Sequence, residues 1–189
     1  MGEERAAEHT ADGQDAWERF TTLSTHFRQH PADSRLREHV SGATRTAGSI
    51  PLDLGVIDHL AHTIAELDAI VHEHAPDAAS APHDTADVQD WFAEHTAHLD
   101  DASRMRARTT VYRQGLEHAI AMGDDKVVRR HPCPSCGTWG LFWRPAARRA
   151  ACVNTHCADA NGGLPRTWSL NRLAAAHTAR EETRSRRAT

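Results

Sequence analysis

Four cysteines are the feature of this 189-residue sequence that most restricts what it can fold into. They stand in the segments CPSCG (133–137) and CVNTHC (152–157), and the chain contains no others. Two thiolates separated by two residues can bind one ion from a tight turn, and Gly137 lets the backbone close around the sulfurs. A second pair brought back by a hairpin completes a tetrahedron. We therefore predict one structural Zn²⁺ bound by Cys133, Cys136, Cys152 and Cys157.

The spacing of the second pair leaves other ligand sets open. Four residues separate Cys152 from Cys157, and a histidine stands directly before the last cysteine. His156 can replace Cys157, or His131 can replace one of the cysteines, and four structural or redox cysteines without metal are a further alternative. Disulfides are disfavoured in the reducing setting that the absence of a signal sequence implies. Four protein ligands leave no position for water, which disfavours a catalytic zinc.

Charge divides the chain near residue 125. Residues 1–125 carry 10 Arg, no Lys and 23 acidic residues, a net charge of −13, whereas residues 126–189 carry 12 basic and 3 acidic residues, a net charge of +9. This polarity predicts two regions with opposite electrostatic roles. The predicted organisation is a flexible tail over 1–14, an acidic helical bundle over 15–123, a basic zinc-ribbon domain with a terminal helix over 124–182, and a flexible tail over 183–189.

Apolar residues recur at helical spacing in the acidic part. Helices are predicted over about 15–29, around 34–40, from Pro51 to about His74, from Val88 to Leu99, and from Met105 to Gly123. A narrow apolar seam suited to antiparallel packing is formed by Ile57, Leu60, Ile64, Leu67 and Val71. The seam can be completed within the chain or by a second copy, which leaves a homodimer or a protein partner through the helical region open.

The pattern changes in the basic part. KVVRR (126–130) and TWGLFWR (138–144) are predicted to form short strands with a turn at Pro145. Ser169 is expected to cap a final helix that contains Leu170, Leu173 and Ala174, and residues 179–189 are expected to be frayed and solvated. The predicted fold class is mainly α, with a small helical bundle followed by a C-terminal β-hairpin zinc ribbon and a terminal helix.

The cysteine segments and their surroundings resemble a known group of proteins. CPSCG, the Trp-bearing hairpin, the CVNTHC segment and RTWSLNRLAA are similar to the C-terminal zinc ribbon of small actinobacterial and actinophage proteins that carry a helical region in front. The resemblance covers about residues 131–175 and is only architectural over 50–123. Ribbons of this kind imply binding to nucleic acid or to a protein partner, although the function of the group is poorly defined.

The hairpin alternates aromatic and basic side chains. Strand geometry places Trp139 and Trp143 on one face, and Phe142 and Arg144 on the other. Arginines neutralise phosphates while exposed rings stack on unpaired bases. We expect contact with DNA or RNA, with little sequence specificity, through Trp139, Trp143, Arg144, Arg148 and Arg149. In two alternatives, the aromatic residues form the ribbon's own small core while the arginines face water or the acidic bundle, or an unknown protein partner docks on the hairpin.

Fifteen histidines raise the question of a metallohydrolase. On the long helix, His59, His62 and Glu66 project away from the apolar seam and are expected to face solvent. His26 and His30 have a spacing that suits a metal, but the chain contains no HExxH, phosphate-binding loop or nucleophile elbow. We therefore expect a solvated histidine-rich surface and no enzyme.

Other classes are restricted by hydropathy. No segment approaches the roughly 18 to 20 consecutive apolar residues of a membrane-spanning helix, and the first residues lack the features of a signal peptide. The sequence favours a cytoplasmic, non-enzymatic accessory or regulatory protein whose ribbon contacts nucleic acid. The rival interpretation is a protein–protein adaptor in which zinc is purely structural and no nucleic acid is bound.

Overall fold

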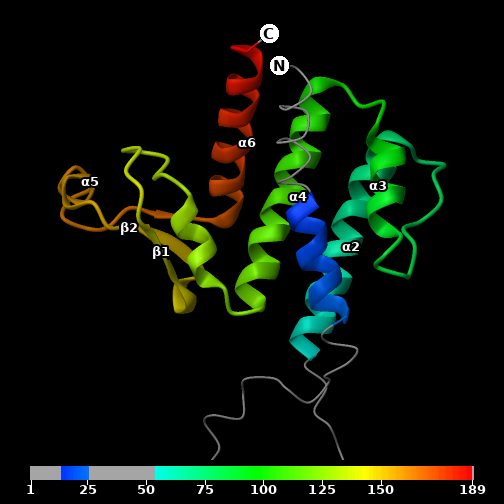
Figure 1. Cartoon of the computed structure of the whole chain (residues 1–189), viewed down its shortest axis with the longest axis horizontal. Coiled ribbons are helices and arrows are strands. Elements are labelled where there is room, and N and C mark those ends of the chain that lie inside the picture. Colours follow the sequence, from blue (N-terminus) through cyan, green and yellow to red (C-terminus); the bar gives the residue numbers. More distant parts are fainter. Residues whose placement is uncertain (1–13, 26–53, 189) are drawn as a thin grey trace, which may run out of the picture.

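The computed structural model describes residues 14–25 and 54–188, with side chains from residue 58 onward in the second range. This part of the chain is mainly helical, with a small antiparallel sheet near the C-terminus followed by a terminal helix, which confirms the predicted fold class (Figure 1). The predicted helix around 34–40, the end of the helix predicted over 15–29, and the pair His26 and His30 lie outside the described residues. The tail predicted over 1–14 does too, except residue 14, where the first helix begins.

The acidic part forms a helical bundle. Its helices are the first helix (14–25), α2 (Leu54–His74), α3 (Val88–Thr96) and α4 (Asp101–Ala121). Local signals define the ends of α4, because the Asp100 carboxylate accepts hydrogen bonds from the backbone N–H groups of Ala102 and Ser103, and Gly123 takes a φ of +86° directly after the helix. The predicted end of α2 at His74 and the predicted end of α4 near Gly123 are thus confirmed.

One apolar core joins the four helices of the bundle. Its buried members are Phe20, Leu67, Ile70, Val71, Val88, Phe92, Leu99 and Ala107. Leu67 and Val71 belong to the predicted seam, and Phe20 of the first helix packs in the same cluster. The described part of the seam is therefore covered within the chain.

The polar face of α2 differs from the prediction. His62 is exposed as expected, but His59 and Glu66 are only partly exposed because α4 packs along that flank. The Arg113 guanidinium of α4 donates to the Glu66 carboxylate, and the His59 ring lies 5.1 Å from the ring of buried His118. The prediction that His59 and Glu66 face solvent is therefore wrong. The periodicity of apolar residues identifies the face of α2 that packs in the apolar core, but it does not identify a face that packs against another helix through polar side chains.

The basic part contains a three-stranded antiparallel sheet in the order β1-β2-β3. Its elements are a 3-10 helix (Asp125–Arg130), β1 (Leu141–Arg144), a 3-10 turn (Pro145–Ala147), β2 (Arg149–Cys152), α5 (Thr155–Asp159) and β3 (Thr167–Trp168). The strand at TWGLFWR and the turn at Pro145 are confirmed. The strand predicted at KVVRR is wrong, because these residues form the 3-10 helix. Val127 and Val128 are both buried. A helical turn that packs against α4 can bury two successive side chains, whereas successive side chains of a strand point to opposite faces.

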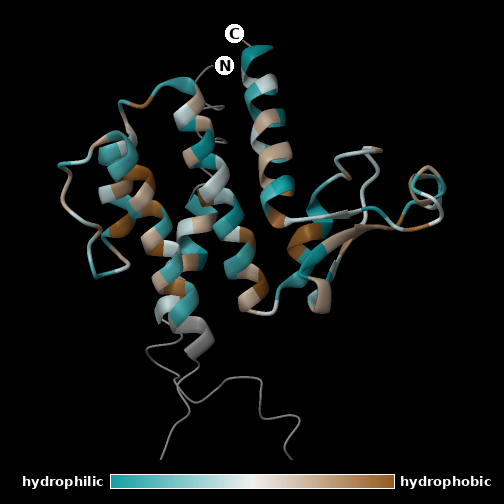
Figure 2. Cartoon of the chain, turned by 180° about the vertical axis from the view of Figure 1, so that it is seen from behind, coloured by the Kyte–Doolittle hydropathy of each residue, from teal (hydrophilic) through white to brown (hydrophobic). Residues whose placement is uncertain are grey.

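The terminal helix α6 (Leu170–Arg186) packs along α4 (Figure 1). The Ser169 hydroxyl accepts a hydrogen bond of 3.2 Å from the backbone N–H of Arg172, which confirms the predicted cap. Far along the helix, Glu182 lies 3.5 Å from the Arg108 guanidinium of α4. The helix continues to Arg186, and its end is mainly hydrophilic and largely exposed, as predicted (Figure 2). Fraying of residues 179–189 and the flexible tail over 183–189 stay predictions.

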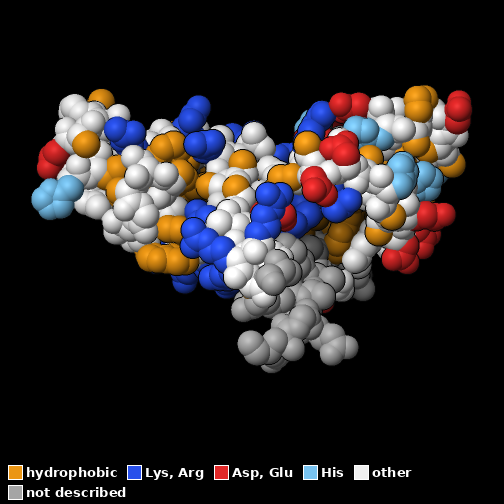
Figure 3. Space-filling view, turned by 90° about the horizontal axis from the view of Figure 1, so that it is seen from above, with side chains coloured by type: hydrophobic (Ala, Val, Ile, Leu, Met, Phe, Trp, Pro, Cys, Tyr) orange, Lys and Arg blue, Asp and Glu red, His pale blue; other side chains and the backbone are white. Residues whose placement is uncertain are grey.

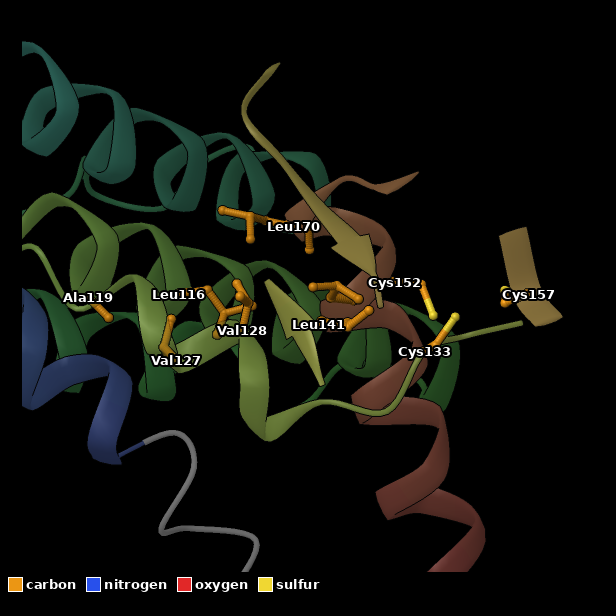
Figure 4. Packing of buried hydrophobic residues seen from close by; sticks show 11 residues of the cluster. Leu116, Ala119, Val127, Val128, Cys133, Leu141, Cys152, Cys157 and Leu170 are labelled. Carbon is orange, nitrogen blue, oxygen red and sulfur yellow. The ribbon is translucent and has the colours of Figure 1, made fainter. Parts of the chain in front are cut away.

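The ribbon and the end of α4 share a second core, whose residues run from Ala119 at one end to Cys157 at the other (Figure 4). Its buried members are Leu116, Ala119, Val127, Val128, Cys133, Leu141, Ala150, Cys152, Cys157, Leu170 and Leu173. Because helical, hairpin and metal-site residues belong to one cluster, the sheet is fixed against the bundle.

Gly115 of α4 allows the first helix to approach closely. A Cβ at this position would lie 2.7 Å from the Cβ of Ala16. We expect Gly115→Ala to lower the free energy of unfolding by about 1–3 kcal/mol in urea denaturation, because overpacking outweighs the helix propensity gained. Adding Ala16→Gly removes this closest contact and leaves one of 3.1 Å to the Cα of residue 16, so the double variant should be more stable than the sum of the single effects predicts. Additive effects would contradict this packing.

His118 generates a prediction on pH dependence. It is 2% exposed, its ring lies 5.1 Å from that of Phe20, and burial lowers its pKa to about 3. Below about pH 6.5 the unfolded chain binds a proton that the native state excludes, so the free energy of unfolding falls as the pH drops from 6.5 toward 3. His118→Gln should reduce this slope by up to about 1.4 kcal/mol per pH unit, measured by denaturation between pH 7 and 4.5.

The matched control is His62→Gln on exposed α2 surface. It should leave the slope close to that of the wild type. Equal slopes for His118→Gln and the wild type would show that His118 titrates normally in the native state.

Candidate metal centre

The structure brings the four cysteines to one point. Their sulfur atoms all lie within 4.8 Å of one another, and no disulfide joins them. The Sγ atoms of Cys136 and Cys152 are 3.7 Å apart. Tetrahedral coordination with metal–sulfur bonds of about 2.3 Å places sulfur atoms about 3.8 Å apart. The spacing of the thiols therefore fits a single bound metal ion.

The first pair lies in a tight turn. The backbone N–H of Cys133 donates to the Thr138 carbonyl and that of Gly137 donates to the Cys133 carbonyl, each at 2.9 Å. Gly137 has a φ of +71°, which a residue with a side chain adopts only with strain. The backbone angle favours glycine here and crowding does not, because a Cβ at this position would have no other atom within 4 Å.

A short helix explains the unusual spacing of the second pair. Cys152 ends β2, and Cys157 lies in α5. The Asn154 carboxamide oxygen accepts a hydrogen bond of 3.0 Å from the backbone N–H of His156 and starts α5. The turn of helix uses the two extra residues and returns Cys157 to the other sulfurs.

Neither alternative histidine ligand belongs to the cluster. His131 is 1% exposed, and its Nε2 lies 2.9 Å from the Tyr112 hydroxyl. His156 is exposed on α5. Within the part of the chain that the structure describes, the only group of potential metal ligands is the set of four cysteines.

The thiols of the cluster differ in acidity. Hydrogen bonds from Thr138 lower the pKa of Cys136 to about 6, whereas burial raises the pKa of Cys152 to about 12 and also raises that of Cys157. Metal ions bind the thiolate form. A cation must therefore displace protons from the buried thiols, so metal affinity falls as the pH falls.

Asn154 links the two pairs and was missed by the sequence analysis. Its Nδ2 lies 3.7 Å from the Cys136 sulfur and 2.9 Å from the Thr138 hydroxyl, and its backbone N–H donates to the Cys152 sulfur at 3.5 Å. Groups that hydrogen-bond ligating atoms fix their orientation. The sequence contained one indication of this role, because asparagine is a common N-capping residue and Asn154 stands inside the CVNTHC segment.

The residues predicted to contact nucleic acid fall into two sets. Arg144, Arg148 and Arg149 are exposed, and Trp139 is 64% exposed. Trp143 is instead half-buried and packs on the shared core. Phe142, which the prediction placed on the other strand face from Trp143, is 37% exposed. The hairpin thus has an outer surface that carries both arginines and aromatic rings.

Charge is unevenly distributed over the molecule. In Figure 3, Lys and Arg side chains gather over the centre of the visible face, while Asp and Glu concentrate toward the α2–α3 end at the right. Within the described residues, none of Arg144, Arg148 and Arg149 forms an ion pair, whereas Arg106 of α4 lies 2.8 Å from Glu73. The basic groups of the hairpin are therefore available to an external anion.

Fold and site together define a helical protein with a cluster of four cysteines that fits one metal ion. Comparison with protein-family models, with curated proteins and with solved structures found no match. None of the helices in the described segments has the length and apolar character needed to cross a membrane.

The contacts of Asn154 predict a supporting role in metal binding. Asn154→Ala removes the hydrogen bond to Cys136 and the cap of α5, so we expect metal affinity to fall about tenfold or more in competition with a chelator. Asn161→Ala is the matched control, because Asn161 bonds the Leu164 carbonyl in an exposed turn. Equal affinities for the two variants would refute this role.

Proposed function

We propose that this chain is a non-enzymatic accessory or regulatory protein whose ribbon, organised by Zn²⁺, contacts nucleic acid with little sequence specificity. The observation that carries the proposal is the outer surface of the hairpin. Phe142 and Arg144 are exposed on one face of β1, Arg149 is the partner of Arg144 across the hairpin, and Trp139 is exposed in the segment that leads into β1. Such a surface offers cations to phosphates and rings to unpaired bases.

Zinc is the metal that the donor set favours. Four thiolates form a soft tetrahedral site typical of structural zinc, and all four positions are taken by the protein. Metal analysis of the purified protein tests this assignment, with one zinc per chain expected for the wild type and loss of zinc expected for Cys133→Ser. Stoichiometric iron in place of zinc would contradict it.

Unpaired arginines support nucleic acid as the partner. The bundle uses its own arginines internally, since Arg113 contacts both Glu66 and Glu117. The hairpin arginines have no such carboxylate among the described residues. Because the sheet fixes the backbone of Arg144 and Arg149, only their side chains have to be ordered when they bind phosphates, which favours binding through the backbone of a nucleic acid.

Salt dependence is the sharpest test of this proposal. The full chain should bind a random single-stranded oligonucleotide with an affinity that falls as salt rises, by about 0.7 logarithmic units per phosphate contact for each logarithmic unit of salt. The double variant Arg144→Gln/Arg149→Gln should reduce this slope by about 1.4. Fluorescence anisotropy from 50 to 200 mM salt measures both, for DNA, RNA and duplex.

Arg106→Gln is the matched control, because it removes one exposed charge from the bundle. It should leave the slope nearly unchanged. An absence of binding at low salt would overturn the proposal.

A protein–protein adaptor is the second candidate function. Apolar side chains are exposed on the ribbon at Trp139, Val153 and Leu164, with exposed fractions of 64%, 54% and 68%. Exposed apolar groups of this kind are typical of surfaces that bind partners. If the chain binds no nucleic acid at low salt, these residues favour the adaptor.

A further inference from the structure

A cleft of about 520 Å³ lies between the bundle and the ribbon. Helices α2 and α4 contribute His59, Arg113 and Glu117, the hairpin contributes Trp143 and Arg148, and the first turn of α6 contributes Asn171. Its size falls in the range of small-molecule sites. Neither the metal centre nor the exposed hairpin surface accounts for it.

An aromatic and apolar wall forms one side of the cleft. Trp143 is half-buried on the shared core and also lines the cleft, together with Ile120 and Leu170. No ring contact joins Trp143 to another described aromatic residue. The indole therefore offers apolar surface to a planar ligand.

Arg148 supplies a cation at the ribbon side. It is the only non-glycine residue of the described chain with a positive φ, at 49°, and it lines the cleft from the hairpin turn. Its neighbour Arg149 begins β2 and does not line the cleft. The charge of Arg148 has no carboxylate partner among the described residues.

The bundle side offers fixed polar groups. Arg113 Nη1 donates to the Glu117 carboxylate at 2.6 Å, and the same guanidinium contacts Glu66. Arg113 thus faces two carboxylates and this wall has a surplus of negative charge, whereas Arg148 forms no ion pair with a described residue. A ligand in this cleft meets hydrogen-bonding groups on the α4 wall and an uncompensated positive charge at the hairpin.

We propose that the cleft binds one nucleotide unit, with its base between Trp143 and the polar wall of α4 and its phosphate at Arg148. This inference rests on the proposed function and deepens it. The base comes either from a bound single strand or from a free nucleotide, because both present the same chemistry. An apolar ligand would leave the charge of Arg148 without a polar partner in the cleft, which disfavours it.

The experiment uses the full, metal-loaded chain and two kinds of probe. Equilibrium dialysis measures binding of adenosine monophosphate, and anisotropy measures a 12-nucleotide strand and the same strand with abasic central positions. We expect the base-bearing strand to bind about tenfold tighter than the abasic strand, the range expected for one stacked base. Adenosine monophosphate should bind at one site per chain.

Two variant pairs assign these effects to the cleft. Arg148→Asn removes the charge with a residue that tolerates a left-handed backbone, and Arg149→Gln removes the neighbouring charge outside the cleft. Both should weaken strand binding, but only Arg148→Asn should weaken binding of the mononucleotide. Trp143→Leu should reduce the preference for the base-bearing strand severalfold, whereas Trp139→Leu should leave mononucleotide binding intact.

The outcomes separate the two proposals. Competition between mononucleotide and strand identifies the strand as the source of the base, and mononucleotide binding without competition identifies a free nucleotide. If no mononucleotide binds and Arg148→Asn behaves like Arg149→Gln on both strands, the cleft proposal is overturned, even where salt-dependent strand binding upholds the proposed function. Metal content and circular dichroism show whether each variant is folded. If Trp143→Leu does not fold, the comparison of Arg148→Asn with Arg149→Gln decides between the outcomes.

Discussion

The packing of the ribbon against the end of α4 is the interaction on which the rest of the structure depends. The sheet has few large apolar residues of its own, and Leu141 becomes buried only in a cluster that includes Leu116 of α4 and Leu173 of α6. The cysteine cluster lies at the far end of the same core, where a bound metal ion would join the segments of the ribbon (Figure 4). A small domain with so little core needs such a fastening. The hairpin is thus held at both ends, which gives its exposed side chains a defined arrangement.

Elements set by local signals could be predicted from the sequence. The cysteine spacing, the cap at Ser169 and the alternation in β1 each depend on neighbouring residues, and the structure has the elements that they predict. The failures arise where a distant element decides the outcome. Val127 and Val128 favour a strand locally but are both buried against α4, and Glu66 is held by Arg113, 47 positions away. A single sequence does not show which distant residues come into contact, so it could predict neither the helical turn at Val127 and Val128 nor the partner of Glu66.

The acidic and basic parts of the sequence are not held together mainly by long-range attraction between their net charges. Long-range attraction between an acidic and a basic region is weak beyond a Debye length of about 8 Å at physiological salt. The structure instead pairs the acids with arginines of the helices themselves, as in Arg106 with Glu73 and Arg108 with Glu182. This internal pairing leaves the hairpin arginines without partners among the described residues. The sequence therefore indicated the surplus of positive charge correctly, but not why that surplus is available.

Strand β2 runs from the hairpin turn at the cleft to the cysteine cluster. Strand β2 begins at Arg149, directly after Arg148 at the cleft, and ends at Cys152 in the metal centre. A metal that orders this four-residue strand also orders the wall from which Arg148 projects. A ligand in the cleft would then bind a wall that is already ordered, so less conformational entropy of the protein would be lost on binding. A metal ion held by the four cysteines would therefore favour the proposed binding without touching the ligand, because it would preorganise residues that line the cleft.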